Sequence, residues 1–346
     1  MEFAPTLTKE FESKVETKAL KMYLDDKDIN FIVLAVDNPN FGTKVKSYEV
    51  EICGKKCVDW VINACNKLPT IKRVDVKHDM MKEIKPLLND SEWTVVLYSD
   101  TPLIKNSTIT EAFKCAEEKW LNVCKLTRGY ILKTDYAKRA DEIFGVETYY
   151  FDEEDFIICS NLKQLSIISD IMKNRIIEFL MKKGVRVVDA NSTYIESDVV
   201  IGKGSVVEPL SVVKGHVEIG EDCVIGYGSK IQNSKIGNNC KTENCQIIES
   251  VLLNNVNVCD FSVVKKCLVQ DNTKIQNAFV SGANIYREVM IETGAKIEST
   301  AGRIKILSGA KIGKNVVIEK PVTIGENAKI NALKNIIENI DANAEI

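Results

Sequence analysis

Histidine is nearly absent from this chain, with only His78 and His216 among 346 residues. The 11 cysteines contain no CxxC pair; the nearest are Cys53 with Cys57 and the pair at positions 240 and 245. Structural zinc sites use closely spaced cysteine and histidine ligands, so this spacing argues against zinc. We interpret the cysteines as reduced thiols that serve as small, mostly buried apolar groups.

A strong net charge and a long apolar run are also missing. The 46 lysines and arginines nearly balance 49 aspartates and glutamates, which leaves a net charge of -3 and argues against binding to nucleic acid. No apolar stretch approaches the roughly 20 residues of a membrane-spanning helix. The stretch MEFAPTLTKEFESK at the N-terminus lacks the apolar centre of a signal peptide. We therefore expect a cytoplasmic protein without a membrane partner.

The second half of the chain contains a six-residue repeat. Aliphatic residues recur at every sixth position from residue 201 to 231 and from residue 306 to 336. Small residues such as Ser205 and Ala310 often follow four positions later. A period of six fits neither a helix nor a simple strand, and it predicts a triangular parallel β-helix of about eight coils. Between residues 240 and 286 the repeat loses phase, through either a bulged loop or tolerated sequence drift.

Strands and helices alternate in the first half. Residues 29–36 (INFIVLAV) and 93–100 (WTVVLYSD) have the pattern of buried strands, and residues 58–68 and 107–120 that of helices. This alternation predicts an α/β layer with a mostly parallel sheet. A further helix is expected before Gly184. We divide the chain into an α/β domain, here called the head (1–161), a linker helix (162–184) and a β-helix, here called the coil (185–346).

Three segments resemble the sugar-nucleotide pyrophosphorylases. LYSDTPLI (97–104) is similar to the strand end where that family binds its metal, and CGKKCVDWVINACNKL (53–68) resembles the segment after its nucleotide loop. Residues 180–209 resemble the junction of the bifunctional N-acetylglucosamine-1-phosphate uridyltransferase/glucosamine-1-phosphate acetyltransferases. The resemblance implies a Rossmann-like nucleotidyltransferase domain, then a left-handed parallel β-helix of hexapeptide repeats that assembles into homotrimers.

The same resemblance implies a magnesium site in the head. Asp100 matches the family's metal aspartate, at the carboxyl end of a strand, where parallel sheets bind ligands. The second ligand in the family is an asparagine; here Ser160 falls at that position and Asn161 one place later. Either side chain offers the hard oxygen that Mg²⁺ prefers.

Other parts of the family's site are changed. Asp37 stands where the first glycine of the nucleotide loop is expected, and a carboxylate there repels phosphate. Lys44, Lys46 and Lys55 are the candidate phosphate ligands. The family's base-binding segment has no counterpart between residues 78 and 93.

The coil lacks the Gly-His-x-x-Tyr motif that holds the family's acetyltransferase base. Its only histidine, His216, lies in an early turn, and we interpret it as a solvent-facing residue. Without a base, acetyl transfer loses a contribution of order 10²–10⁴. The missing second coil histidine also disfavours an acyltransferase for another substrate.

Two functions remain open. In the first, uridyltransferase activity is lost or much reduced, acetyltransferase activity is absent, and the protein is a trimeric binding or scaffold protein. In the second, the head is an active Mg²⁺-dependent nucleotidyltransferase that acts on a sugar 1-phosphate with altered nucleotide specificity. The candidate small-molecule partner is a nucleotide or a sugar phosphate.

Overall fold

The structure is a computed structural model, and it describes residues 23–143, 146, 148 and 151–346. The N-terminal stretch considered above for a signal peptide lies outside these residues. The chain divides into two compact units at residue 172, inside helix α6 (Leu162–Lys182). The division at residues 161 and 184 stays a prediction. None of the described helices is long and apolar enough to cross a membrane.

The head contains one five-stranded sheet. Its strand order is β4 (Thr70–Asp75), β1 (Ile29–Asp37), β5 (Trp93–Tyr98), β7 (Gly129–Lys133) and β6 (Val123–Leu126). β4 and β5 run parallel to β1, whereas β7 runs antiparallel to both β5 and β6. Only β7 is therefore reversed, which confirms the mostly parallel sheet.

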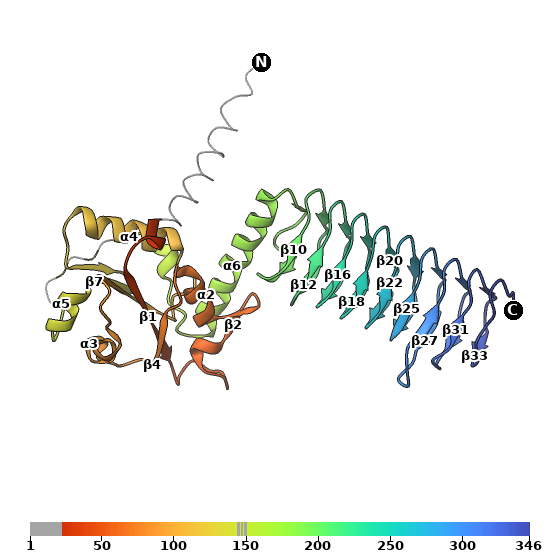
Figure 1. The fold of residues 1–346 in the computed structure, drawn as a ribbon, viewed down its shortest axis with the longest axis horizontal. Helices are drawn as coiled ribbons and strands as arrows, with labels where there is room; N and C mark the ends of the chain where they lie inside the picture. The colour runs from red at the N-terminus through yellow and green to blue at the C-terminus, as the bar shows by residue number, and fades with distance from the viewer. Residues whose placement is uncertain (1–22, 144–145, 147, 149–150) are drawn as a thin grey trace, which may run out of the picture. The chain divides into compact units, whose positions relative to one another are not determined.

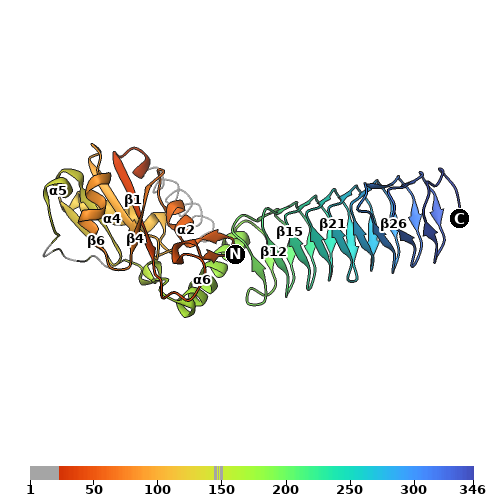
Figure 2. The ribbon, with the colours of Figure 1, turned by 90° about the horizontal axis from the view of Figure 1, so that it is seen from below.

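Helices cover both faces of this sheet (Figure 2). α2 (Cys57–Ala64) and α4 (Asn106–Glu118) pack on one face, and α3 (Met80–Ile84) and α5 (Thr134–Arg139) pack on the other. The helices expected at 58–68 and 107–120 are confirmed, although α2 ends four residues early. The short elements are η1 (Ser47–Glu49), β2 (Glu51–Ile52), β3 (Lys55–Lys56), η2 (Lys85–Leu87) and η3 (Glu153–Phe156).

The second unit is a three-sided coil of parallel strands (Figure 1). Two faces have nine strands and one has eight, which confirms the expected β-helix and its size. The first face consists of β8 (Arg186–Val187), β11 (Val206–Val207), β14 (Val224–Ile225), β17 (Lys241–Thr242), β20 (Asn257–Cys259), β23 (Lys274–Gln276), β26 (Met290–Ile291), β29 (Lys311–Ile312) and β32 (Lys329–Ile330).

The other two faces follow the same order along the coil. The second face consists of β9 (Tyr194–Ile195), β12 (Val212–Lys214), β15 (Lys230–Gln232), β18 (Gln246–Ile248), β21 (Val263–Lys265), β24 (Phe279–Ser281), β27 (Lys296–Glu298), β30 (Val317–Ile318) and β33 (Asn335–Ile336). The third face consists of β10 (Val200–Ile201), β13 (Glu218–Ile219), β16 (Lys235–Ile236), β19 (Val251–Leu252), β22 (Leu268–Val269), β25 (Ala283–Ile285), β28 (Ile304–Ile306) and β31 (Thr323–Ile324).

A ladder of inward side chains fills the coil. The register places aliphatic residues of neighbouring coils beside one another: Val213 lies beside Ile231, and Ile318 beside Ile336. Each fully buried aliphatic side chain contributes about 1.5–3 kcal/mol. Small residues fill the corners. Cys223 occupies the position that Ser205 occupies one coil earlier. Ser205 Oγ donates a hydrogen bond to Gly220 O in the next coil, and Cys223 Sγ likewise donates to Gly237 O. All 11 cysteines are free and none is exposed, which agrees with their use as small buried groups.

The stretch from residue 240 to 286 continues the coil. Some hexapeptides are shortened to five residues, as between the inward residues Thr242 and Ile247 and between Ile275 and Val280. The bulged-loop interpretation is therefore wrong, and the drift interpretation is confirmed. The outward loop lies later, at residues 299–303 after β27 (Figure 1).

A substitution of Thr242 tests how much the inward side chains contribute to the stability of the coil. It is a fully buried threonine at an inward position, and its hydroxyl donates only a long 3.4 Å hydrogen bond to Val224 O. Because a poorly bonded buried hydroxyl costs about 1–3 kcal/mol, we expect Thr242→Val to raise the free energy of unfolding of the coil by about 1 kcal/mol. Urea denaturation followed by far-UV circular dichroism measures this change. The matched reverse substitution one coil later, Val258→Thr, should destabilise; a loss of stability in Thr242→Val would contradict the account.

Candidate functional site

Asp100 lies where the sequence places it, just beyond the end of β5. The main chain around it is fixed, since Ser99 N donates to Leu34 O (3.0 Å) and Cys159 N donates to Asp100 O (2.7 Å). The side chain of Asp100 is only 12% exposed. A carboxylate so far buried requires a partner of opposite charge.

Arg128 is that partner. Its Nη2 donates to Asp100 Oδ2 (2.7 Å) and its Nε donates to Oδ1 (3.2 Å), a two-point contact that matches both carboxylate oxygens. The guanidinium also stacks over the Tyr98 ring, 4.0 Å from its centre. Burial lowers the pKa of Arg128, but the hydrogen bonds and negative charge of Asp100 outweigh it and raise the pKa above its usual value. Burial also raises the pKa of Tyr98, to about 12.

The turn between β6 and β7 positions Arg128. Gly129 begins β7 and pairs with Leu97 on β5, so the residue before it reaches the end of that strand. Only glycine fits there, because a Cβ on Gly129 would lie 2.8 Å from Val96 O and its φ is +142°. Sequence reasoning missed Arg128. The available signal was an arginine directly before a glycine that starts a strand.

Ser160 and Asn161 lie close to Asp100 along the chain that follows Cys159, but each has other partners. Asn161 Oδ1 accepts a hydrogen bond from Gln164 N (3.0 Å) in the first turn of α6, and Asn161 Nδ2 donates to Ser160 Oγ (3.2 Å). Ser160 O accepts from Asn38 Nδ2 (2.9 Å).

The test of these residues against Mg²⁺ is therefore negative in this arrangement. Both oxygens of Asp100 contact Arg128, and the Asn161 oxygen caps a helix. Within the described part of the chain, no three His, Cys, Asp or Glu side chains gather in a way that could hold a metal. We derive no catalytic step through a metal, and the assignment of Asp100, Ser160 and Asn161 stays a prediction.

The three candidate lysines do not converge. Lys46 forms an ion pair with Asp37, which raises the pKa of Lys46. Lys55 lies in the β2–β3 hairpin with its Nζ 5.4 Å from the centre of the Trp60 ring, and Lys44 is exposed. Their role as phosphate ligands stays a prediction.

A small hollow lies at the carboxyl ends of β1 and β4. It has a volume of about 280 Å³ and is lined by Asp37, Lys46, Tyr48, Arg73, Val74, Asp75 and Glu83. Pockets for drug-sized ligands have about 300–1,000 Å³. Three carboxylates face only two cations in this hollow, so its charge does not favour a polyphosphate.

His216 is exposed on a coil turn, as expected, and its backbone N donates to Asn233 Oδ1 (3.2 Å). It is the only histidine in the sequence of the coil.

Comparisons with known proteins agree with this architecture. A family profile described as "Bacterial transferase hexapeptide (six repeats)" matches residues 198–233, and one described as "GlmU-like, C-terminal hexapeptide" matches residues 226–302. The Bifunctional protein GlmU of Clostridioides difficile is 26% identical over 407 aligned residues, which cover 84% of this chain and 89% of that protein. The chain is similar to the GlmU proteins over most of its length.

Two other GlmU relatives differ in how much of each chain the match covers. The Bifunctional protein GlmU of Fervidobacterium nodosum is 28% identical and covers 75% of this chain and 76% of its own length. That of Alkaliphilus metalliredigens is 30% identical, but the match covers 58% of this chain and only 48% of the relative. The GlmU-like chain thus matches about half of that second relative.

The pairing of Asp100 with Arg128 in this GlmU-like head can be measured. Arg128→Gln leaves a mostly buried carboxylate without its cation, so we expect a loss of about 2 kcal/mol or more in the free energy of unfolding. The double variant with Asp100→Asn should recover part of that loss. All three tryptophans (Trp60, Trp93 and Trp120) belong to the head, so urea denaturation followed by tryptophan fluorescence reports on the head alone.

Lys138→Gln is the matched control, because Lys138 pairs with the fully exposed Asp90. Exposed pairs contribute about 0–1 kcal/mol, so this variant should remain close to wild type. An Arg128→Gln variant as stable as the control would show that the pair has no structural role.

Proposed function

We propose that this GlmU-like protein is a binding or scaffold protein whose head has lost all or most uridyltransferase activity and whose coil does not transfer acetyl groups. The observation that carries the proposal is the two-point contact between Arg128 and Asp100. A guanidinium bound to both oxygens supplies the positive charge that a metal would otherwise supply, and it blocks the carboxylate from a second cation.

Two further observations support the same function. The hollow beside β1 is small and rich in carboxylates, and Lys46 is neutralised by Asp37. Phosphoryl transfer depends on positioning and on neutralising the charge of the phosphates, and neither is provided there. The proposal includes a cytoplasmic homotrimer that assembles through the coil.

An alternative function has one observation in its favour. Cys159 N bonds to Asp100 O, so the chain brings Ser160 and Asn161 next to the carboxylate, as a two-ligand site requires. If Arg128 moved aside, Asp100 with Ser160 or Asn161 would hold Mg²⁺, and Lys44, Lys46 and Lys55 would be available to phosphates. The head would then be an active nucleotidyltransferase for a sugar 1-phosphate.

Thermal unfolding with nucleotides distinguishes the two functions. We expect the melting temperature of the head, followed by tryptophan fluorescence, to stay unchanged with Mg²⁺ and about 1 mM UTP, CTP, dTTP or a UDP-sugar. A ligand present at a hundred times its Kd would add about 2.7 kcal/mol to the stability.

The variant Asp100→Ala decides the meaning of any shift. A Mg²⁺-dependent stabilisation that disappears in Asp100→Ala would establish the enzyme and overturn the scaffold proposal. Asp141→Ala is the control, since Asp141 is 96% exposed and pairs with Lys85 at the surface. A shift that both variants abolish would be general destabilisation and not ligand binding at Asp100.

A further inference from the structure

Every coil after the first turns a corner between its first and second faces at a residue with left-handed backbone angles. This residue lies three positions before the inward residue of the second face, and we call this column of residues the Phe261 corner. In one coil the preceding residue, Asp260, is left-handed as well, with a φ of +58°. Glycine or asparagine occupies it in five coils, at Gly228, Asn244, Asn277, Gly294 and Asn315. These are the residue types that adopt positive φ with least strain.

The other three coils use large apolar residues at this position. Leu210, Phe261 and Leu333 have φ values of +60°, +65° and +66°. A side chain of this kind in the left-handed region costs about 1–2 kcal/mol. These side chains are also 50%, 72% and 78% exposed, so burial within the chain does not offset the strain.

The other two corners of the coil show that this choice is not required by the fold. Between the third and first faces, the left-handed positions are glycine, asparagine or an acid such as Asp222 or Glu288. Between the second and third faces they are glycine, asparagine, Glu249 or Lys266. Throughout the coil, all of which the structure describes, apolar residues occur at left-handed positions only in the Phe261 corner.

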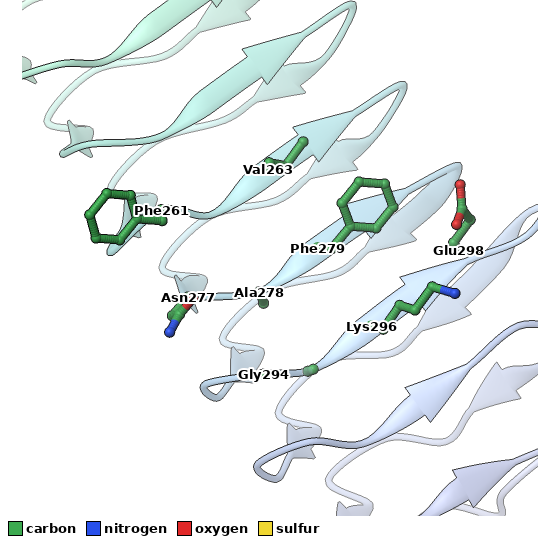
Figure 3. A pocket seen from close by; sticks show the side chains of 9 residues that line it. Phe261, Val263, Asn277, Ala278, Phe279, Gly294, Lys296 and Glu298 are labelled. Carbon is green, nitrogen blue, oxygen red and sulfur yellow. The ribbon is translucent and has the colours of Figure 1, made fainter.

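A hollow lies beside the Phe261 side chain. Figure 3 shows Phe261 projecting at one end, with Val263 and Phe279 on neighbouring strands of the second face. The hollow has a volume of about 480 Å³, and Lys296 and Glu298 lie along its far side. An exposed aromatic ring beside an apolar hollow is typical of a protein–protein contact.

We propose that the Phe261 corner packs against second copies of this chain. This inference rests on the homotrimer in the proposed function and identifies the surface that forms it. The corner column carries no charged residue from Leu210 to Leu333, so symmetry-related copies would not bring like charges together. Asp260, just before Phe261, is turned toward the first face, where it accepts a hydrogen bond from Gln276 Nε2 (2.8 Å).

The spacing of the apolar residues also suits another copy. Strands rise by about 4.8 Å per coil, so the seven coils from Leu210 to Leu333 span about 34 Å. A parallel second copy has the same axial repeat. Leu210 and Phe261, three coils apart, and Phe261 and Leu333, four coils apart, would therefore each lie beside the same residue of the second copy along the whole Phe261 corner. A partner of unrelated fold would not share this repeat.

The test replaces the three apolar residues with the residue that neighbouring coils use. The triple variant Leu210→Asn, Phe261→Asn and Leu333→Asn keeps the left-handed turns and relieves their strain, so the coil should unfold at an equal or higher urea concentration. The concentration at which the trimer dissociates should rise roughly a hundredfold, since central aromatic contacts dominate such interfaces. Sedimentation velocity of the full chain over a dilution series measures this.

The control variant is Glu249→Asn with Glu288→Asn, which changes left-handed positions at the other two corners and should leave the trimer unchanged. Phe261→Asn alone should give an intermediate effect. A wild-type trimer that the triple variant leaves intact would overturn this surface but not the trimer. A wild-type monomer at all concentrations would overturn both, whereas the nucleotide test of the head stands apart from either result.

Discussion

Every coil of the β-helix depends for its stability on the coils stacked against it. A single turn has three short strands of two or three residues and cannot bury its inward side chains alone. Stacking converts those side chains into continuous columns, and the rest of the architecture follows from that constraint. Small residues are needed at the corners, left-handed residues at the turns, and strict parallel register along each face.

The head obeys a different constraint, the charge of one mostly buried carboxylate. Asp100 ends a strand in the way that ligand sites of parallel sheets do, yet its charge is compensated from within the protein. The compensating group, Arg128, lies in the turn directly before the reversed strand β7, which joins an otherwise parallel sheet. The position of this arginine is set by the topology of the sheet, and its contact with Asp100 bears directly on whether the head can bind a metal.

The sequence allowed the coil, the strands around Asp100 and the position of Asp100 to be predicted, because each depends on local periodicity. Arg128 could not be predicted, since its contact with Asp100 depends on the register between β5 and β7, and no local pattern reports that register. The loop at residues 299–303 was not predicted for a related reason. The loss of phase was located from 240 to 286, where the coil only shortens some hexapeptides and forms no loop. The charge of Lys46 and its place in the loop after the first strand make it a candidate phosphate ligand, but neither feature predicts its pairing with Asp37.

The outward loop after β27 has a consequence for how this protein can be altered. Ile297 before it and Ile304 after it remain fully buried, and Arg303 fastens its end by donating to Asn284 Oδ1 (2.9 Å). The entropic cost of closing a loop rises only slowly with its length when both ends are held. This loop can therefore accept foreign sequence without disturbing the stack of coils. A peptide epitope or a small fluorescent domain placed there would mark the coil while leaving its interior as it is.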